Sequence, residues 1–164
     1  MAAKDVIVLN SHGVGQYAYC DHMPAWGETL PVTGWQIAED GGKGSHVTVA
    51  LGRLVSSGAY VGKVGDDAWG ELGDTWMREA GADTTFLYRD PNVSTGTGLI
   101  LIASDGRNTV IDGDSSSEAL TVEEVTDALE AMKGSKYFVT GFEVPTKVSL
   151  AGAVRAHELG MVTV

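Results

Sequence analysis

The chain has one cysteine, few basic residues and no long apolar run. Its single cysteine, Cys20, excludes an internal disulfide and a cysteine-based zinc site. No stretch approaches the roughly 18 apolar residues of a membrane-spanning helix, so we expect no membrane partner. With 22 acidic against 11 basic residues, the net charge of −11 argues against a nucleic-acid partner. These absences favour a cytoplasmic protein.

Glycine, by contrast, is abundant, with 22 residues among 164. Folded proteins average about 7% glycine, so this content predicts many tight turns and close backbone approaches. Hydrophobic residues make up 43% of the chain and charged residues 20%, which fits a globular core and argues against disorder. The four histidines, at positions 12, 22, 46 and 157, lack metal-ligand spacing, so we expect no metal site.

Short apolar runs that alternate with helical patterns indicate an α/β fold with a central, mostly parallel sheet. The runs lie at 6–9, 59–64, 85–88, 137–140 and 161–164, and the helical patterns at about 45–54, 69–80, 121–133 and 145–160. Ser45 is expected to cap the first helix. The apolar face of that helix would consist of Val47, Ala50, Leu51 and Leu54. Thr121 and Glu124 form a capping-box pattern at the start of the third helix.

Two segments, at about 16–38 and 96–112, show a different pattern. In the first, aromatic and apolar residues alternate with polar ones and are interrupted by glycine and proline. In the second, two apolar runs flank the turn Ser104–Arg107, as in a β-hairpin. We expect a small antiparallel sheet there. Because the chain stops inside its last apolar run, we interpret residues 1–164 as the N-terminal part of one α/β domain that is C-terminally incomplete.

Ligands of open α/β sheets bind beyond the carboxyl ends of the strands, so the loops at those ends hold the candidate residues. In the loop 40–46, glycines allow a ligand to approach the backbone, the helix N-terminus offers N–H donors and Lys43 adds a positive charge. An exposed glycine-rich turn is the alternative. Glu143, after the strand 137–140, could orient a ligand hydroxyl or lie on the surface. Asp66 and Asp67 are best explained as caps of the following helix.

The stretch Gly13-Val-Gly-Gln-Tyr-Ala18 mimics the dinucleotide fingerprint G-x-G-x-x-A. That fingerprint requires a helix that begins in the loop, so that the pyrophosphate lies at its N-terminus. The residues after Gln16 have no helical apolar face and soon meet Pro24. If the protein were an NAD-binding oxidoreductase of the Rossmann type, a helix would begin at Gln16. The alternation of residues instead predicts a strand there.

Several short motifs occur in a fixed order along the chain. They are Pro24-Ala-Trp-Gly-Glu-Thr29, Gly41-Gly-Lys-Gly44, Val64-Gly-Asp-Asp-Ala-Trp-Gly70, Ser94-Thr-Gly96 and Glu143-Val-Pro145. In this order and spacing they resemble the ribokinase-like (PfkB) family of carbohydrate and nucleoside kinases, and the resemblance covers essentially the whole chain.

The resemblance implies a ribokinase-like fold in which the segments 16–38 and 96–112 form a lid over the sugar. Such a lid excludes water, which would compete as phosphoryl acceptor. The lids of related dimers pair with each other, so a homodimer paired through the lid is expected. The implied substrate-binding residues are Gly41, Gly42, Lys43, Gly98 and Glu143, followed by His46 and His12.

The sequence also departs from the family pattern. The family's G-x-N-x-D after the first strand reads Asn10-Ser-His-Gly-Val-Gly15 here, without the aspartate, and His46 replaces a sugar-binding asparagine. We hypothesise that His12 and His46 form a different hydrogen-bonding pair for another polyol or nucleoside. The family's catalytic motif, D-T-x-G-A-G-D, is absent. The resemblance therefore implies that the catalytic base lies in a C-terminal half outside this sequence.

These features predict the sugar-binding and lid half of an ATP-dependent carbohydrate kinase that phosphorylates a hydroxyl of a sugar, polyol or nucleoside. ATP, Mg²⁺ and a monovalent cation would bind mainly to the other half, and this 164-residue stretch alone is expected to be inactive. A non-catalytic sugar-binding or dimerisation module is the alternative, and the NAD-binding oxidoreductase is the less favoured one.

Overall fold

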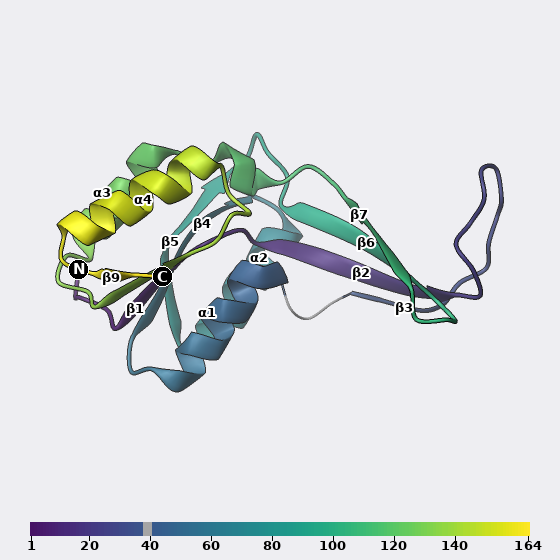
Figure 1. Cartoon of the computed structure of the whole chain (residues 1–164), viewed down its shortest axis with the longest axis horizontal. Coiled ribbons are helices and arrows are strands. Elements are labelled where there is room, and N and C mark those ends of the chain that lie inside the picture. The colour runs from purple at the N-terminus through teal and green to yellow at the C-terminus, as the bar shows by residue number, and fades with distance from the viewer. Residues whose placement is uncertain (38–40) are drawn as a thin grey trace.

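The computed structural model describes residues 1–37 and 41–164. A layered α/β body carries both termini, and a long, flat arm extends from one end of it (Figure 1). The elements in chain order are β1 (Val6–Leu9), β2 (Gly13–Cys20), β3 (Thr33–Ile37), α1 (Gly42–Leu54), β4 (Gly58–Gly65), α2 (Ala68–Glu79), β5 (Ala82–Asp90), β6 (Gly96–Ala103), β7 (Asn108–Asp112), the 3-10 helix η1 (Ser116–Ala119), α3 (Val122–Ala131), β8 (Tyr137–Thr140), α4 (Thr146–Glu158) and β9 (Val162–Thr163).

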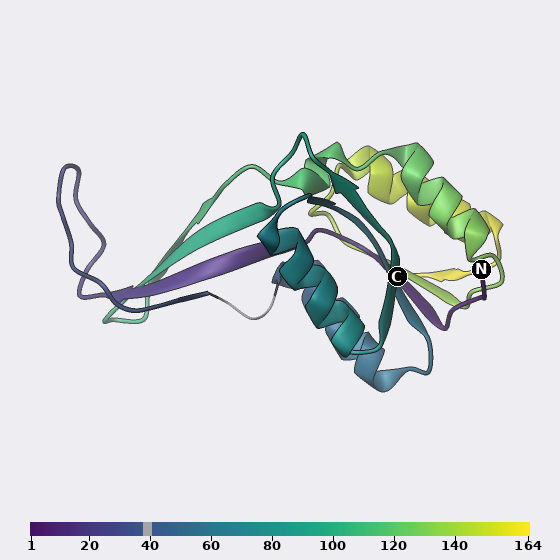
Figure 2. The ribbon, with the colours of Figure 1, turned by 180° about the vertical axis from the view of Figure 1, so that it is seen from behind.

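The body is built on a parallel sheet with strand order β5-β4-β1-β8-β9. Helices α1 and α2 cover one face, and α3 and α4 cover the other (Figures 1 and 2). Alternate residues of β1 enter the two cores: Val8 packs with Tyr60 and Met77, whereas Leu9 packs with Phe138. The apolar run 6–9 is thus buried on both faces, as its composition predicts.

The arm is a second sheet with strand order β3-β2-β6-β7. Its outer pairs, β2 with β3 and β6 with β7, are antiparallel, as expected. Its central pair, β2 with β6, is parallel, because both strands leave the same end of the body and run outward (Figure 1). Residue 38, at the end of the first predicted lid segment, lies outside the described residues, as does Asp40.

The strand β2 decides against the dinucleotide alternative. Gln16 lies in the middle of this strand, where a dinucleotide-binding turn would begin a helix. The prediction of a strand at this position is confirmed.

The prediction that Ser45 caps the first helix is wrong. Helix α1 begins at Gly42, and Ser45 is buried within it. Gly41 and Gly42 have φ values of 67° and 76°, a left-handed entry that glycine adopts readily. The predicted apolar face is confirmed only in part: Leu51 packs against the core, whereas Val47 and Leu54 are exposed. The fully buried positions of the helix are small residues, because a side chain at Gly44 would collide with the Ser11 carbonyl oxygen.

Of the other predicted caps, those at Thr121 and Asp67 are confirmed, whereas Asp66 does not cap α2. The capping box of Thr121 and Glu124 begins α3. Asp67 caps α2 by accepting the Gly70 N–H at 2.9 Å, and its second carboxylate oxygen accepts the Thr95 N–H at 2.8 Å. Burial favours a higher pKa for Asp67, but these backbone hydrogen bonds outweigh it and lower the pKa. Asp67 thereby fixes the start of β6 next to the start of α2.

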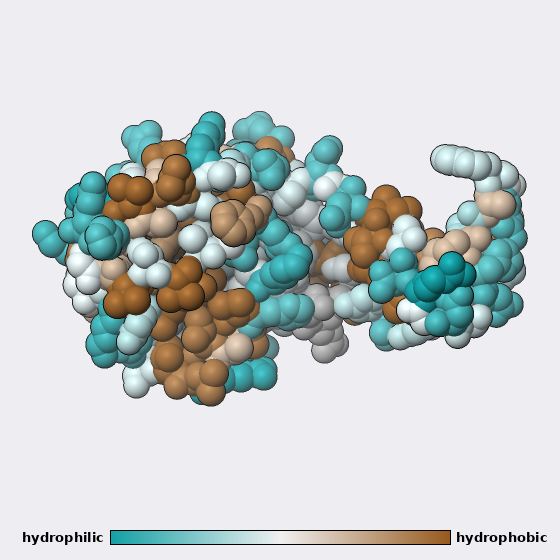
Figure 3. All heavy atoms as spheres, viewed as in Figure 1, coloured by the Kyte–Doolittle hydropathy of each residue, from teal (hydrophilic) through white to brown (hydrophobic). Residues whose placement is uncertain are grey.

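Strand β9 lies at one edge of the parallel sheet and pairs with β8 alone among the strands described. Hydrophobic side chains gather on the face of the body around α4, α1 and the C-terminus (Figure 3). Exposed apolar residues on these elements and at the C-terminus include Leu54, Leu150, Val154, Val162 and Val164. No helix within residues 1–37 and 41–164 is long and apolar enough to cross a membrane.

Candidate functional site

A cavity of about 920 Å³ lies between the carboxyl ends of the parallel sheet and the base of the arm. Its walls come from β2, β6 and β7, from the start of α1, from η1 and from the loop after β8. Open α/β sheets bind ligands at this end. Five of the predicted site residues lie on its wall together with His12: Gly42, Lys43, His46, Gly98 and Glu143.

Glycines form one side of this cavity, which we call the glycine floor: Gly13, Gly15, Gly96 and Gly98. In the parallel pair of β2 with β6, Gly13 is opposite Gly96, and Gly15 is opposite Gly98. Residues two apart on a strand share a face, so all four lie on one face of the sheet, where Gly13, Gly15 and Gly98 are partly exposed and Gly96 is buried against Ser115. A ligand ring can therefore lie directly on the sheet, which side chains at these positions would prevent.

The next residues outward on the same face are apolar. Tyr17 on β2 is opposite Ile100 on β6, and Ile100 is opposite Val110 on β7. All three line the cavity. The cavity therefore has a bare floor near the body and an apolar wall further along the arm.

The polar end of the cavity contains Glu143, Lys43 and Ser11. Lys43, on the first turn of α1, forms an ion pair with Glu143, and the Ser11 hydroxyl donates to the other Glu143 oxygen at 2.9 Å. Burial favours a higher pKa for the Glu143 carboxyl, but the hydrogen bonds from Lys43 and Ser11 outweigh it and lower the pKa. The hydrogen bond to Glu143 raises the pKa of Lys43. Both groups are therefore charged at neutral pH.

His12 has a different place from the one that we hypothesised. Its side chain is 1% exposed, with Nδ1 2.7 Å from the Ser45 hydroxyl and Nε2 3.2 Å from the Trp69 carbonyl oxygen. A side chain at Gly73 on α2 would collide with the ring. Both ring nitrogens thus join the β1–β2 connection to α1 and α2, which makes His12 a positioning residue. His46 is exposed at the cavity wall and stays a candidate for ligand contact.

Gly41 lies behind the cavity wall. Its carbonyl oxygen accepts the Gly13 N–H at 3.1 Å, which ties the start of α1 to the start of β2. A side chain at Gly41 would come within 2.8 Å of the His12 ring. Its role is therefore to hold the Lys43 loop against the glycine floor.

Six further polar residues, which the sequence did not single out, line the cavity: Ser11, Thr97, Asp112, Asp114, Ser115 and Glu118. Asp112 lies on β7 opposite Gly98, and a side chain at Gly98 would come within 3.1 Å of its carboxylate. The spacing Asp112-Gly-Asp114 after a hairpin was the available signal, but a sequence does not show toward which face such residues point.

Carboxylates around a small cavity suit a ligand with many hydroxyl groups, because each carboxylate oxygen accepts hydrogen bonds. Glu143, Asp112, Asp114 and Glu118 offer such acceptors, and Lys43 offers a donor. No group of three or more histidine, cysteine or acidic residues in the described part of the chain is arranged to hold a metal ion.

Comparisons with known proteins identify the family and the fold of the chain. The family model of pfkB carbohydrate kinases matches residues 38–159, so the chain belongs to this family. It is 27% identical to a ribokinase of Staphylococcus aureus over 97% of the chain and 52% of that protein. It is 29% identical to a deoxyribokinase of Salmonella typhi over 85% of the chain and 45% of that protein.

Solved structures show the same fold. A crystal structure of Sa239 superposes with a TM-score of 0.89 at 24% identity, over 98% of this chain and 53% of that one. Arabidopsis thaliana ribokinase complexed with ribose and ATP superposes with a TM-score of 0.84 at 22% identity, over 98% and 52%. The chain thus spans about half the length of the relatives that it matches.

Proposed function

We propose that the chain forms the sugar-binding half, with its lid, of an ATP-dependent carbohydrate kinase. The whole enzyme would transfer the γ-phosphoryl group of ATP to a hydroxyl of a sugar or of a related polyol or nucleoside. The observation that carries this proposal is the cavity that joins the Lys43–Glu143 pair to the glycine floor. Membership of the pfkB family supports the reaction class.

The proposed sugar lies on the glycine floor with its hydroxyl edge toward Glu143 and Lys43. Because the pKa of Glu143 is lowered, this carboxylate accepts hydrogen bonds from hydroxyl groups throughout the neutral range. The exposed ammonium of Lys43 donates to a sugar oxygen. The C–H face of the ring would contact Ile100 and Val110, which line the same cavity.

The arm acts as the lid in this proposal. Its closure over the sugar would exclude water from the transferring phosphoryl group, since water would otherwise accept it. Tyr19, Trp35 and Ile37 are exposed on the arm. We assign them to contacts with the lid of a second copy, which makes the proposed enzyme a homodimer.

The nucleotide, its Mg²⁺ and a monovalent cation are assigned to residues outside this sequence, as is the catalytic base. The half-length coverage of the ribokinase relatives supports this assignment. Phosphoryl transfer depends on positioning and on electrostatic stabilisation. This chain would supply the position of the acceptor, and ATP would supply the phosphoryl group.

The test is calorimetric titration of the protein with D-ribose, 2-deoxy-D-ribose, D-fructose and adenosine. We expect at least one of them to bind, and Glu143→Gln to weaken it by about tenfold, because a charged hydrogen-bond acceptor is lost. Lys147→Met, on the exposed side of α4, is the matched control and should bind as the wild type does. Equal binding by Glu143→Gln, or no binding of any of the four, would overturn the site.

The reaction is tested on the protein at its full natural length, with ATP and the sugar that binds. Formation of ADP and of the sugar phosphate supports the kinase. Sugar binding without ADP formation would instead support the non-catalytic sugar-binding module.

A further inference from the structure

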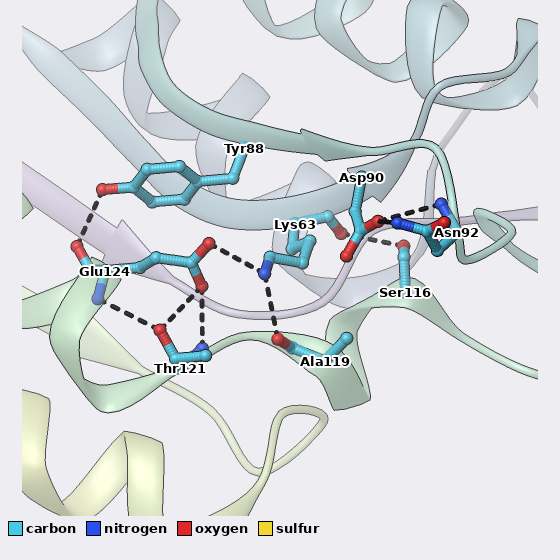
Figure 4. Close-up of polar contacts among 8 residues, drawn as sticks. All are labelled: Lys63, Tyr88, Asp90, Asn92, Ser116, Ala119, Thr121 and Glu124. Atoms are coloured by element: carbon cyan, nitrogen blue, oxygen red, sulfur yellow. Dashed lines mark hydrogen bonds and ion pairs between the residues drawn. The ribbon is translucent and has the colours of Figure 1, made fainter.

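Lys63 is a buried cation behind one wall of the cavity. It lies on β4, and only 6% of the residue is exposed, although lysine is almost never fully buried unless it is paired. Its ammonium lies 2.7 Å from the Glu124 carboxylate and donates to the Ala119 carbonyl oxygen at 3.0 Å (Figure 4). These two contacts join the parallel sheet to η1 and to the start of α3.

The contacts of Lys63 hold the segment of chain that forms this wall. Ala119 is the last residue of η1, and it lines the cavity together with Ser115 and Glu118. The main chain of Lys63 takes part as well, because its carbonyl oxygen accepts the Ser116 hydroxyl at 2.9 Å. The side chain and the backbone of one residue thus hold both ends of η1 on β4.

Glu124, the partner of Lys63, is itself fixed from several sides. Its second carboxylate oxygen accepts the N–H and the hydroxyl of Thr121, each at 2.9 Å. Its backbone carbonyl oxygen accepts the Tyr88 hydroxyl at 2.8 Å (Figure 4). Burial favours a higher pKa for Glu124, but the hydrogen bonds from Lys63 and Thr121 outweigh it and lower the pKa. Lys63 therefore has a rigid, charged anchor.

Stability alone is a weak reason for such an arrangement. A buried ion pair often stabilises a fold no better than well-packed apolar residues, because desolvation offsets the attraction. Not every hydroxyl group of this wall helps to hold it in place. The buried Ser117 hydroxyl has no hydrogen-bond partner among the described residues. The ammonium of Lys63 is the group that reaches from the sheet to the end of η1.

We propose that Lys63 is a positioning residue of the sugar pocket: it fixes the η1 wall opposite the glycine floor and so sets sugar affinity without contact to the sugar. This inference rests on the proposed function. Substitution of a residue that does not contact the ligand typically changes the binding free energy by about 0.5–2 kcal/mol, or the affinity by roughly 2- to 30-fold.

The experiment compares Lys63→Met with Lys4→Met. Lys4 forms a similarly shielded ion pair with Asp83 at 2.6 Å, but at the amino end of the same sheet, away from the cavity. Urea unfolding measures the stability of both variants, and calorimetry measures the dissociation constant of D-ribose, or of whichever of the four probes binds the wild type. Hydrogen–deuterium exchange reports on amides 113–121 without any ligand.

We expect Lys63→Met to weaken the probe about tenfold and to speed exchange at 113–121, whereas Lys4→Met does neither at comparable loss of stability. Lys63→Arg, which keeps the charge, should recover most of the affinity. Equal affinity of Lys63→Met and wild type, or unchanged exchange at 113–121, would overturn the role of Lys63 while the sugar site stands. If no probe binds the wild type, the proposed function fails, and this inference fails with it. If Lys63→Met does not fold, Glu124→Gln, which keeps the shape of the partner, takes its place with the same expectations.

Discussion

The parallel sheet of the body and the sheet of the arm differ in how they bury their residues. Every residue of β1 and β4 is buried, whereas every residue of β3 and β7 is exposed. The parallel strands lie between two layers of helices, as parallel sheets generally do. The base of the arm lines the cavity on one face, so few residues of the arm are buried. From this difference we infer that the body supplies most of the stability of the fold, and that the junction of the two sheets forms the candidate site.

The largest expected effect is on the stability of the body. Phe138 is fully buried in β8, so Phe138→Ala should lower the free energy of unfolding by about 3–5 kcal/mol, through lost burial and a new cavity. Ile111 is 56% exposed on β7 of the arm, and Ile111→Ala should change the free energy of unfolding by less than about 0.5 kcal/mol. Urea unfolding of both variants gives the comparison. Similar losses of unfolding free energy in the two variants would show that the arm stabilises the fold as much as the body does.

The second prediction separates binding from stability at the junction. Gly98→Val places a branched side chain on the glycine floor, within reach of Asp112, and should weaken sugar binding by about 10- to 100-fold through displacement of the ring. Stability should change little, because valine suits a strand. Leu99→Val, the next residue on β6 and on the opposite face, serves as the control in the same titration. If Gly98→Val binds the sugar as tightly as the wild type does, the sugar does not lie on the glycine floor.

The third prediction concerns pH. Burial favours a higher pKa for Asp83, but hydrogen bonds from Lys4 and Thr85 outweigh it and lower the pKa from 3.8 to about 2. Because the folded pKa lies below the unfolded one, the carboxylate stabilises the body above about pH 4, and this contribution is lost as the pH falls toward 2.

Asp83→Asn should therefore remove about 1 kcal/mol of stability at pH 7 and flatten the pH dependence between 4 and 2, after allowance for screening by solvent. Asp105→Asn, at the turn of the β6–β7 hairpin, should change the profile less, because Asp105 is exposed to solvent, although its hydrogen bonds with Arg107 lower its pKa. Urea unfolding at a series of pH values measures both profiles. If Asp105→Asn removes the pH dependence of stability and Asp83→Asn does not, the arm and not the body carries this dependence.

The smallest effect is expected at η1. Ser117→Ala removes a buried hydroxyl that makes no hydrogen bond to any described residue. Since an unsatisfied buried polar group costs about 1–3 kcal/mol, the variant should be as stable as the wild type or slightly more stable. Ser116→Ala, which breaks the bond to the Lys63 carbonyl oxygen, should be less stable. A clear loss at Ser117 would indicate that its hydroxyl supports the wall after all.

Much of the fold could be predicted from local patterns. The apolar run 6–9, the capping box at Thr121 and the hairpin after Gly96 each depend on a few neighbouring residues, and all three are confirmed. The failures have a physical cause. Ser45 has the chemistry of a helix cap, but two left-handed glycines start the helix earlier, and the tight contact with the β1–β2 connection selects small residues for its buried face.

The site is divided in the same way. The sequence by itself determined that Lys43 follows a glycine turn, that Glu143 follows a strand, and that the motifs occur in the order of the pfkB family. Only the tertiary structure decided that the glycines of β2 and β6 lie side by side, that both ring nitrogens of His12 are engaged in the interior, and that Lys63 reaches Glu124. The reason is that caps and turns are set by neighbours in the chain, whereas strand register and buried ion pairs exist only once distant segments have packed.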